Sequence, residues 1–420
     1  MNEFNEFTVI FLFALALSVS VQWWLKLRQI HHVQHYGTAV PQAFFEMILL
    51  SDHQKAAAYT LAKTRFGLIT LTIETILLLI WTLGGLLNYL DQSWQSLGWS
   101  PLWTGMAVVV SMTFISYLLD LPTNLYETFR IETKFGFNRM TLSLYFKDLL
   151  KSWLITLLVL PPMILLVLWL MTHAGAYWWL SVWVVWMTFS LVMLWAYPAF
   201  IAPLFNKFTP LEDVELKQRI ENLLHRNGFS SQGIFVMDGS KRSGHGNAYF
   251  AGLGNQKRIV FFDTLLEGLT HREVEAVLAH EIGHFKHRHV QKRIVMVAII
   301  SLANLALLGW LMQQSWFYQG LGVSTPSTHT ALMLFMLIMP VFTFFLNPIM
   351  AWASRRHEFE ADAFAAQQTE PEALISSLIR LYRDNASTLT PDPLYSAFYD
   401  SHPPAPLRIA HLVRQIRDTP

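Results

Sequence analysis

The sequence predicts a predominantly α-helical, polytopic membrane protein that carries a polar domain with a small β-hairpin on one side of the bilayer. Three observations support this fold class: the composition, a series of long apolar runs, and one polar insert long enough to fold. Of the 420 residues, 53% are hydrophobic and only 14% are charged, whereas about a quarter of the residues in a soluble domain are usually charged. We therefore expect much of the chain to lie within lipid.

Seven apolar runs are long enough to cross a hydrocarbon core of about 30 Å. They lie at residues 7–25, 67–90, 102–121, 153–171, 177–200, 293–312 and 330–352. Tryptophans gather at the run ends, as in the aromatic belts of membrane interfaces; they are Trp23, Trp24, Trp103, Trp153, Trp178, Trp179 and Trp352. One apolar run can be a buried helix of a soluble protein, but seven indicate about seven membrane spans.

The connecting segments alternate in charge. Residues 26–66, 122–152, 201–292 and those after 352 are rich in Lys and Arg, whereas 1–6, 91–101, 172–176 and 313–329 contain neither. The positive-inside rule then places the N-terminus outside and the C-terminus inside, in agreement with an odd number of spans. The acidic start "MNEFNEF" leads into an apolar run without a small-residue cleavage site, so we expect a retained first span.

These patterns divide the chain into four parts. Residues 1–200 form a membrane region with five spans, and 201–292 form a cytoplasmic segment. Residues 293–352 form a two-span hairpin, and 353–420 form a second cytoplasmic segment.

The polar insert 201–292 has its own secondary-structure pattern. Helical periodicity covers about 211–227, and β-type runs follow at 234–237, 248–253 and 258–262. The turn signal "LGNQKR" between the last two predicts a hairpin. A short helix should begin at Asp263 or Thr264, and Thr270 with Glu273 forms a capping-box pattern. We expect the helix that starts there to continue into the sixth span.

The helix after Thr270 contains "VLAHEIGHFKHRH", in which His280 and His284 are separated by four residues. This spacing places both imidazoles on one helix face, one turn apart, where they can bind one zinc ion. Glu281 lies beside that face, where it can take a proton from a zinc-activated water and pass it to a leaving amine. The pattern therefore predicts a zinc-dependent hydrolytic site with one Zn²⁺ per chain.

A third zinc ligand is expected in "SRRHEFEADAFA", residues 354–365. Two spans joined by a short outside loop separate it from the histidines, so the hairpin returns the chain to the membrane face it left. Glu358 can then join His280 and His284, and Asp362, one turn on, can hydrogen-bond the outer nitrogen of a ligating histidine. Glu360 is the alternative if this helix is only a charged juxtamembrane helix.

The composition excludes other kinds of site. The chain has no cysteine, so disulfides, thiol nucleophiles and Cys-zinc modules are excluded. The formal net charge of +1 gives no field for nucleic acid, and we expect no nucleic-acid partner.

Taken together, the motifs resemble those of the M48 zinc metalloproteases, and within them the Ste24-type CAAX prenyl proteases. The similar segments are HEIGHFKHRH, SRRHEFEAD, GHGNAYFAGLGNQKRIVFFDTLL (244–266), ETKFGFNRMT (132–141) and SHPP (401–404), in the family's order. The resemblance implies a gluzincin-like protease domain, with His280, His284 and Glu358 as zinc ligands and Glu281 as the base. It also implies spans that enclose a water-filled chamber. Glu74 lies in the second apolar run, and we expect it either to line this chamber or to pair with one of the basic loops.

The same resemblance assigns further site residues. Asn247, with Ala248 and Tyr249, is similar to the family segment beside the substrate backbone, and a strand opening there could pair with an extended peptide; the alternative for Asn247 is a turn residue. His402 is similar to the family histidine near the scissile carbonyl, where it could stabilise the developing oxyanion; the alternative is a solvated loop histidine. Arg408 matches a nearby family arginine with a structural role.

The remaining histidines of the motif, His287 and His289, are expected to be exposed or to lie at the membrane surface, because the site needs only three ligands.

The leading functional hypothesis is an integral-membrane zinc metalloendopeptidase of the CAAX type. Its partners would be a peptide or protein substrate, including prenylated C-terminal peptides, and membrane lipids. The alternatives are an HtpX-like quality-control protease and, more remotely, a metal-sensing transporter or receptor. We expect a bacterial inner membrane, with the site on the cytoplasmic side, because the chain ends RDTP without a dilysine-type tail and its 313–329 loop is short; the endoplasmic reticulum membrane is the alternative.

Overall fold

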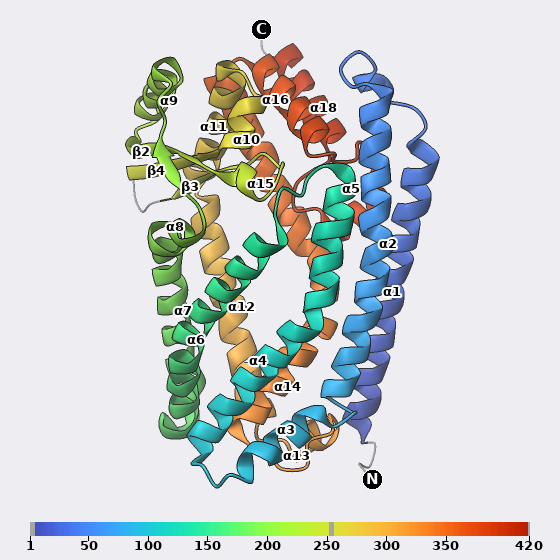
Figure 1. Cartoon of the computed structure of the whole chain (residues 1–420), viewed down its shortest axis with the longest axis vertical. Helices are drawn as coiled ribbons and strands as arrows, with labels where there is room; N and C mark the ends of the chain where they lie inside the picture. The colour runs from blue at the N-terminus through green and yellow to red at the C-terminus, as the bar shows by residue number, and fades with distance from the viewer. Residues whose placement is uncertain (1–4, 252–255, 419–420) are drawn as a thin grey trace.

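A computed structural model describes residues 5–251 and 256–418 and shows an elongated, mostly helical molecule (Figure 1). The beginning of α1 (Glu6–Tyr36) and the end of α18 (Ala405–Asp418), the first and last described helices, lie toward opposite ends of the long axis (Figure 1). This arrangement requires an odd number of crossings if the long axis is the membrane normal.

Within the described residues, seven helices are long and apolar enough to cross a membrane, which confirms the expected number. They are α1 (Glu6–Tyr36), α2 (Leu50–Trp81), α4 (Pro101–Tyr126) with α5 (Thr133–Phe135), α6 (Leu142–His173), α7 (Trp178–Ala196) with α8 (Ala202–Phe205), α12 (His289–Leu311), and α14 (Thr328–Thr343) with α15 (Asn347–Gln368). Short π-helical turns join α4 to α5 (Glu127–Glu132) and α7 to α8 (Tyr197–Ile201), and a 3₁₀ turn joins α14 to α15 (Phe344–Leu346).

The second span differs from the predicted run at 67–90. Its helix, α2, ends at Trp81, and Gly85 (φ +74°) turns the chain into the separate short helix α3 (Leu86–Gln95). Because the apolar residues continue through the turn, hydropathy alone could not place this break. With α13 (Ser315–Gln319), α3 closes the end of the molecule near the N-terminus (Figure 1).

A cavity of about 500 Å³ lies among the spans and is lined by residues of α1, α2, α4 and α14 to α15. Its polar lining includes Glu74, Asp120 and Asn347. Glu74 therefore faces this cavity, and Lys26 of the first basic segment is close enough to interact with its charge, so the two predicted environments do not exclude each other.

The polar domain lies at the opposite end of the molecule, near the C-terminus (Figure 1). Its four strands, β1 (Phe208–Pro210), β2 (Ser230–Met237), β3 (Ala248–Ala251) and β4 (Gln256–Phe262), form one sheet in the order β1-β2-β4-β3. Only the β2–β4 pair is parallel. The predicted β3–β4 hairpin is confirmed, although its turn at 252–255 lies outside the described residues. The strand β1 was not predicted.

Six helices complete this domain, and all of them except α17 bury one apolar core together with the sheet and the end of α15. They are α9 (Val214–Arg226), α10 (Asp263–Gly268), α11 (His271–Lys286), α16 (Pro371–Asp384), α17 (Pro393–Tyr399) and α18 (Ala405–Asp418). Ile220, Ile259, Leu278 and Leu412 are at most 1% exposed in this core.

The helix α11 begins as predicted but does not continue into the sixth span. The Thr270 side chain caps the backbone of Glu273, and the Glu273 side chain caps that of Thr270, so the capping box is confirmed. At the other end, Arg288 adopts a left-handed conformation (φ +57°), and α12 begins as a new helix at His289. The motif helix is thereby free to take its own direction relative to the membrane.

Candidate metal centre and active site

The site forms where α11 of the polar domain packs against α15, the helix that leaves the last span. The two backbones approach closely at Gly283, where an added Cβ would lie 3.0 Å from the Ala361 Cα atom. Any larger side chain at Gly283 would push the helices apart. This contact brings the histidine face of α11 against residues of α15 that lie more than seventy positions later in the sequence.

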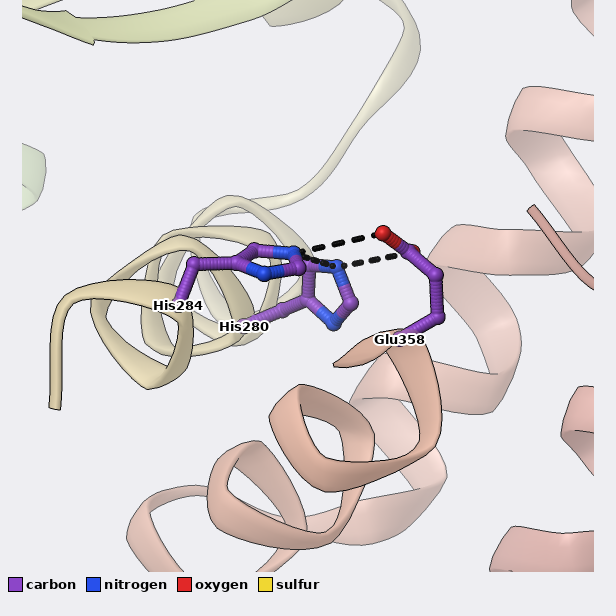
Figure 2. Close-up of side chains that lie close together, drawn as sticks. All are labelled: His280, His284 and Glu358. Atoms are coloured by element: carbon purple, nitrogen blue, oxygen red, sulfur yellow. Dashed lines mark hydrogen bonds and ion pairs between the residues drawn. The ribbon is translucent and has the colours of Figure 1, made fainter. Parts of the chain in front are cut away.

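His280, His284 and Glu358 point toward one another from these two helices, as Figure 2 shows. The His280 and His284 Nε2 atoms are 3.2 Å apart, and each lies 3.4 Å from a carboxylate oxygen of Glu358. Among the described residues they form the one histidine and carboxylate group with ligand atoms all within 4.8 Å of one another. The alternative carboxylate, Glu360, is directed elsewhere.

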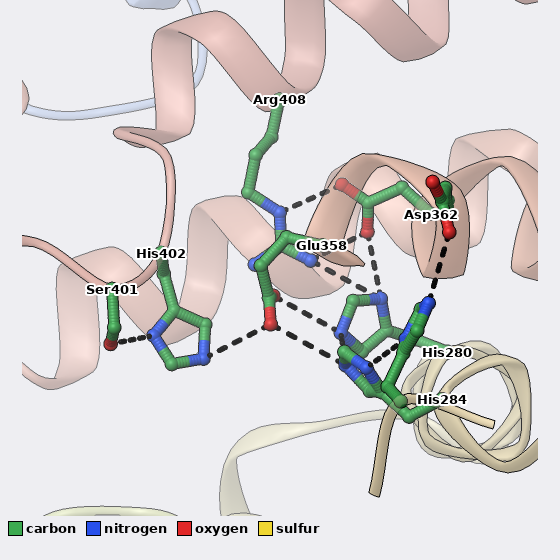
Figure 3. A network of polar contacts seen from close by, with 9 residues as sticks. His280, His284, Glu358, Asp362, Ser401, His402 and Arg408 are labelled. Atoms are coloured by element: carbon green, nitrogen blue, oxygen red, sulfur yellow. Dashed lines mark hydrogen bonds and ion pairs between the residues drawn. The ribbon is translucent and has the colours of Figure 1, made fainter. Parts of the chain in front are cut away.

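The outer nitrogen of His280 contacts a buried ion pair (Figure 3). His280 Nδ1 lies 2.8 Å from Asp362 Oδ1, and Arg408 donates two hydrogen bonds to the same carboxylate at 2.8 and 2.6 Å. Asp362 is fully buried and Arg408 is 7% exposed. Because Asp362 accepts from His280 Nδ1–H, the Nε2 lone pair of His280 points to the centre of the site.

The outer nitrogen of His284 contacts a residue that the sequence did not assign to the site. His284 Nδ1 lies 2.9 Å from His289 Nδ1, and His289 Nε2 lies 3.0 Å from Glu360 Oε2. His289 is only 3% exposed, so the first of its two predicted environments, exposed or at the membrane surface, was wrong, whereas His287 is exposed. The left-handed turn at Arg288 explains the difference, because it redirects the chain and turns His289 back onto α11 and α15.

The donor set fits a metal ion. If both Nδ1 atoms carry the protons that these contacts need, two Nε2 lone pairs and one carboxylate converge without a proton between them, and only a cation satisfies all three. The Glu358 Oε2 atom agrees, since it is buried and makes no hydrogen bond.

The pKa values of the two histidines are shifted in opposite directions. Burial alone would lower the pKa of His280, but the neighbouring carboxylates of Asp362 and Glu358 outweigh it and raise the pKa to about 9. Burial, helped by the charge on His280, lowers the pKa of His284 to about 3. The pocket thus favours one positive charge held at one point, which is what a bound cation supplies.

Glu281 lies in a cavity of about 360 Å³ that adjoins the triad, and His280, Glu358 and Arg408 line the same cavity. Burial raises the pKa of the Glu281 carboxyl, so its carboxylate is a stronger base than one at the surface. Leu265, Val277, Leu374 and Leu378 form an apolar part of the lining of this cavity, whereas Asn247, Asn385 and Ser387 are polar.

The predicted substrate residues are only partly brought to the cavity. Asn247 and Ala248 line it, whereas Tyr249 does not. The strand β3 that follows Asn247 is an edge strand, because it pairs with β4 on one side only. Its outer edge can accept an extended peptide.

His402 also lines the cavity. Its Nε2 atom lies 3.5 Å from Glu358 Oε1, while its side chain is 64% exposed and its Nδ1 contacts the Ser401 hydroxyl at 3.0 Å (Figure 3). The residue is therefore solvated and yet placed at the triad.

Two further lining residues were missed: Tyr382 in α16 and Asn385, which caps its C-terminal end. The Tyr382 hydroxyl donates to the Pro403 carbonyl at 3.3 Å, which holds the segment before Arg408. Asn385 Oδ1 accepts from the Gly246 N–H at 3.2 Å and so fixes the start of β3. The sequence of α16 shows only an amphipathic helix, which gave no signal for either contact.

The membrane spans hold an HExxH helix, a glutamate that follows one hairpin later, and an open strand edge. This combination defines a membrane-embedded metallopeptidase. Family models of membrane metallopeptidases match nearly the whole chain. A family model described as the CAAX prenyl protease N-terminal region with five membrane helices matches residues 29–207, and one described as peptidase family M48 matches residues 210–416. The chain belongs to peptidase family M48.

Individual relatives are similar over most of their length. The CAAX prenyl protease 1 homolog of Mus musculus is 33% identical over 100% of this chain and 98% of its own length, and that of Arabidopsis thaliana is 33% identical over 91% of each. The crystal structure of S. mikatae Ste24p superposes with a TM-score of 0.91 at 31% identity and covers 97% of this chain and 99% of that one.

These findings identify the chain as an integral-membrane metalloprotease of the Ste24 type, acting on peptide or protein substrates. They do not favour the quality-control or transporter alternatives.

Proposed function

We propose that the protein is a zinc endopeptidase in which His280, His284 and Glu358 bind one Zn²⁺ ion. The observation that carries this proposal is the convergence of the three ligand atoms, with the buried Glu358 Oε2 left without a hydrogen bond. Two imidazoles and one carboxylate with an open fourth position are the usual donor set of a catalytic zinc.

Glu281 acts as the general base and acid. When bound, the zinc ion would polarise the scissile carbonyl and lower the pKa of water toward about 7. Glu281 accepts the proton of the attacking water and later donates it to the leaving amine, in a cavity where burial makes its carboxylate a stronger base. His402 lies at the triad, where it donates a hydrogen bond to the developing oxyanion.

The buried side chains around the ligands keep them oriented. Asp362 holds the His280 tautomer, and Arg408 holds Asp362 in turn.

The substrate binds as an extended chain beside β3. Asn247 and Ala248 line the cavity, and the open edge of β3 supplies main-chain hydrogen bonds that hold the scissile bond over Glu281. Tyr249 contributes through its backbone, since its side chain does not line the cavity. The names of the relatives support a prenylated C-terminal peptide as one substrate.

The site faces the cytoplasm in this proposal, and the membrane is a bacterial inner membrane. The basic segments 26–66 and 122–152 lie at the same end of the molecule as the polar domain, in agreement with the positive-inside rule (Figure 1).

The test uses purified full-length protein, a farnesylated C-terminal peptide and its unprenylated twin, with product masses and bound zinc measured together. We expect Glu281→Gln to retain one zinc per chain and to lose cleavage by about 10²–10⁴-fold, which is the typical contribution of a general base. The exposed neighbour variant His287→Ala is the matched control and should keep both. Wild-type cleavage by Glu281→Gln, or cleavage that survives complete zinc removal, would contradict the mechanism.

A further inference from the structure

A groove of about 680 Å³ runs between α2 and the α4–α5 segment on the part of the molecule nearest the polar domain. Its floor is apolar and aromatic, with Phe66, Ile69, Tyr126 and Phe129 among the lining residues. The Phe66 and Tyr126 rings stack across it with centroids 5.0 Å apart. Three basic side chains line the same groove: Arg65, Arg130 and Lys134.

The groove opens toward lipid and away from the cavities inside the molecule. Ile69, Ile76 and Ile80 are 56%, 52% and 42% exposed and recur at helical spacing on one face of α2. Arg65 lies one turn before Ile69 on that face. Glu74, which lines the internal cavity, lies on the other side of the helix. The floor therefore faces acyl chains.

The basic groups reach the depth of the lipid headgroups. At 1.5 Å per residue, Arg65 lies about 24 Å before Trp81 at the end of α2, so its backbone is still within a core of about 30 Å and its long side chain extends to the headgroups. Arg130 lies nearly thirty residues after the start of α4, beyond what a span needs.

All three basic side chains are exposed, and none has an ion pair or side-chain hydrogen bond within the described residues. The two nearest carboxylates in sequence are already engaged. Glu127 pairs with Lys63 at 3.2 Å, and Glu132 contacts both Lys63 and the Tyr59 hydroxyl. The groove thus carries uncompensated positive charge above an apolar floor.

The same contacts fix the shape of the groove. Lys63 and Tyr59 of α2 bind the π-helical turn Glu127–Glu132 from the side opposite the groove, so they hold α2 and the α4–α5 segment at a set separation. The groove is a built feature of the packing and exists without a ligand.

We propose that this groove binds one anionic phospholipid of the surrounding membrane. Arg65, Arg130 and Lys134 hold its phosphate and headgroup, and one acyl chain lies over Ile69 and Phe66. Basic pockets between spans at the cytoplasmic surface are suited to anionic headgroups, and guanidinium groups bind phosphate oxygens in paired hydrogen bonds.

The experiment titrates full-length protein in a neutral detergent with phosphatidylglycerol and, separately, with phosphatidylcholine of the same acyl chains. Native mass spectrometry counts the bound lipids. The groove variant carries Arg65→Gln, Arg130→Gln and Lys134→Gln. The matched control carries Arg139→Gln, Arg293→Gln and Lys147→Gln, which removes the same charges from exposed positions outside the groove. A soluble glycerol phosphate arm tests the headgroup alone.

We expect wild type and control to bind one phosphatidylglycerol in preference to phosphatidylcholine and to bind glycerol phosphate far more weakly. A basic residue at an anionic membrane surface contributes about fivefold in affinity, so the groove variant should lose that preference by on the order of a hundredfold. If the triple variant fails to fold, Arg130→Gln alone should lose about fivefold. Equal losses in groove and control variants, or no loss in the groove variant, would overturn the proposal.

Discussion

The two histidines of α11 lie one turn apart and face the same point, yet the protein supports their outer nitrogens in different ways. His280 contacts Asp362, whose side chain is fully buried and is bound twice by Arg408. His284 contacts His289, whose other nitrogen reaches Glu360, a carboxylate with 30% of its side chain exposed.

The two sides differ in how much folding free energy is lost when the contact to the outer nitrogen is removed. Asp362 has no access to water, so it depends on Arg408 for its charge. Glu360 has water and a second partner, Arg356 at 3.2 Å. The His280 side therefore links the stability of the fold to ligand orientation, whereas the His284 side orients a ligand while contributing little to stability.

Arg408→Met removes one partner of the buried ion pair on the His280 side, and we expect it to have the largest effect on stability. Removing one partner of a buried ion pair typically costs about 3–5 kcal/mol, because the remaining charge stays buried. We expect the thermal midpoint in detergent to fall by on the order of 5–10 °C and zinc affinity to fall with it, measured by unfolding scans and chelator competition.

The double variant Asp362→Leu with Arg408→Met separates the two effects. An apolar replacement of the whole pair should restore much of the thermal midpoint, but His280 would still lack its acceptor, so zinc affinity should stay about 10–100-fold low. Wild-type zinc affinity in the double variant would show that Asp362 does not orient His280.

His289→Ala tests the other side and should give a smaller, selective effect. We expect zinc affinity to fall about 10–100-fold, because His284 loses the acceptor for its outer N–H, while the thermal midpoint of the metal-free protein changes by far less than in Arg408→Met. The control His287→Ala removes an exposed neighbour and should leave both values unchanged. A loss of stability as large as that of Arg408→Met would contradict the proposed division of roles.

The contrast also explains which parts of the site the sequence could predict. His280, His284, Glu358 and Asp362 lie on regular helices, so spacing and the hairpin between two spans were sufficient to bring them together. His289 was left out of the site because three ligands were already assigned, and it lies beyond a left-handed residue, Arg288, through which helical spacing does not carry.

The same limit applies to the fold. Seven spans and the β3–β4 hairpin follow from hydropathy and strand periodicity. The end of α2 at Trp81 follows from the turn at Gly85, inside an apolar run that hides it. Tyr382 and Asn385 reach the cavity through the tertiary packing of α16, which no local pattern records.

Arg356→Gln should have the smallest effect, and it tests whether the His284 side depends on the ion pair at Glu360. Arg356 is 69% exposed and pairs with Glu360 at the i, i+4 spacing, and exposed pairs of this kind contribute about 0.3–0.5 kcal/mol. Glu360 would keep its contact with His289 at 3.0 Å, so zinc affinity should change by less than about twofold by chelator competition. A tenfold loss would mean that His289 depends on the full charge pair around Glu360, and the His284 side would then resemble the His280 side.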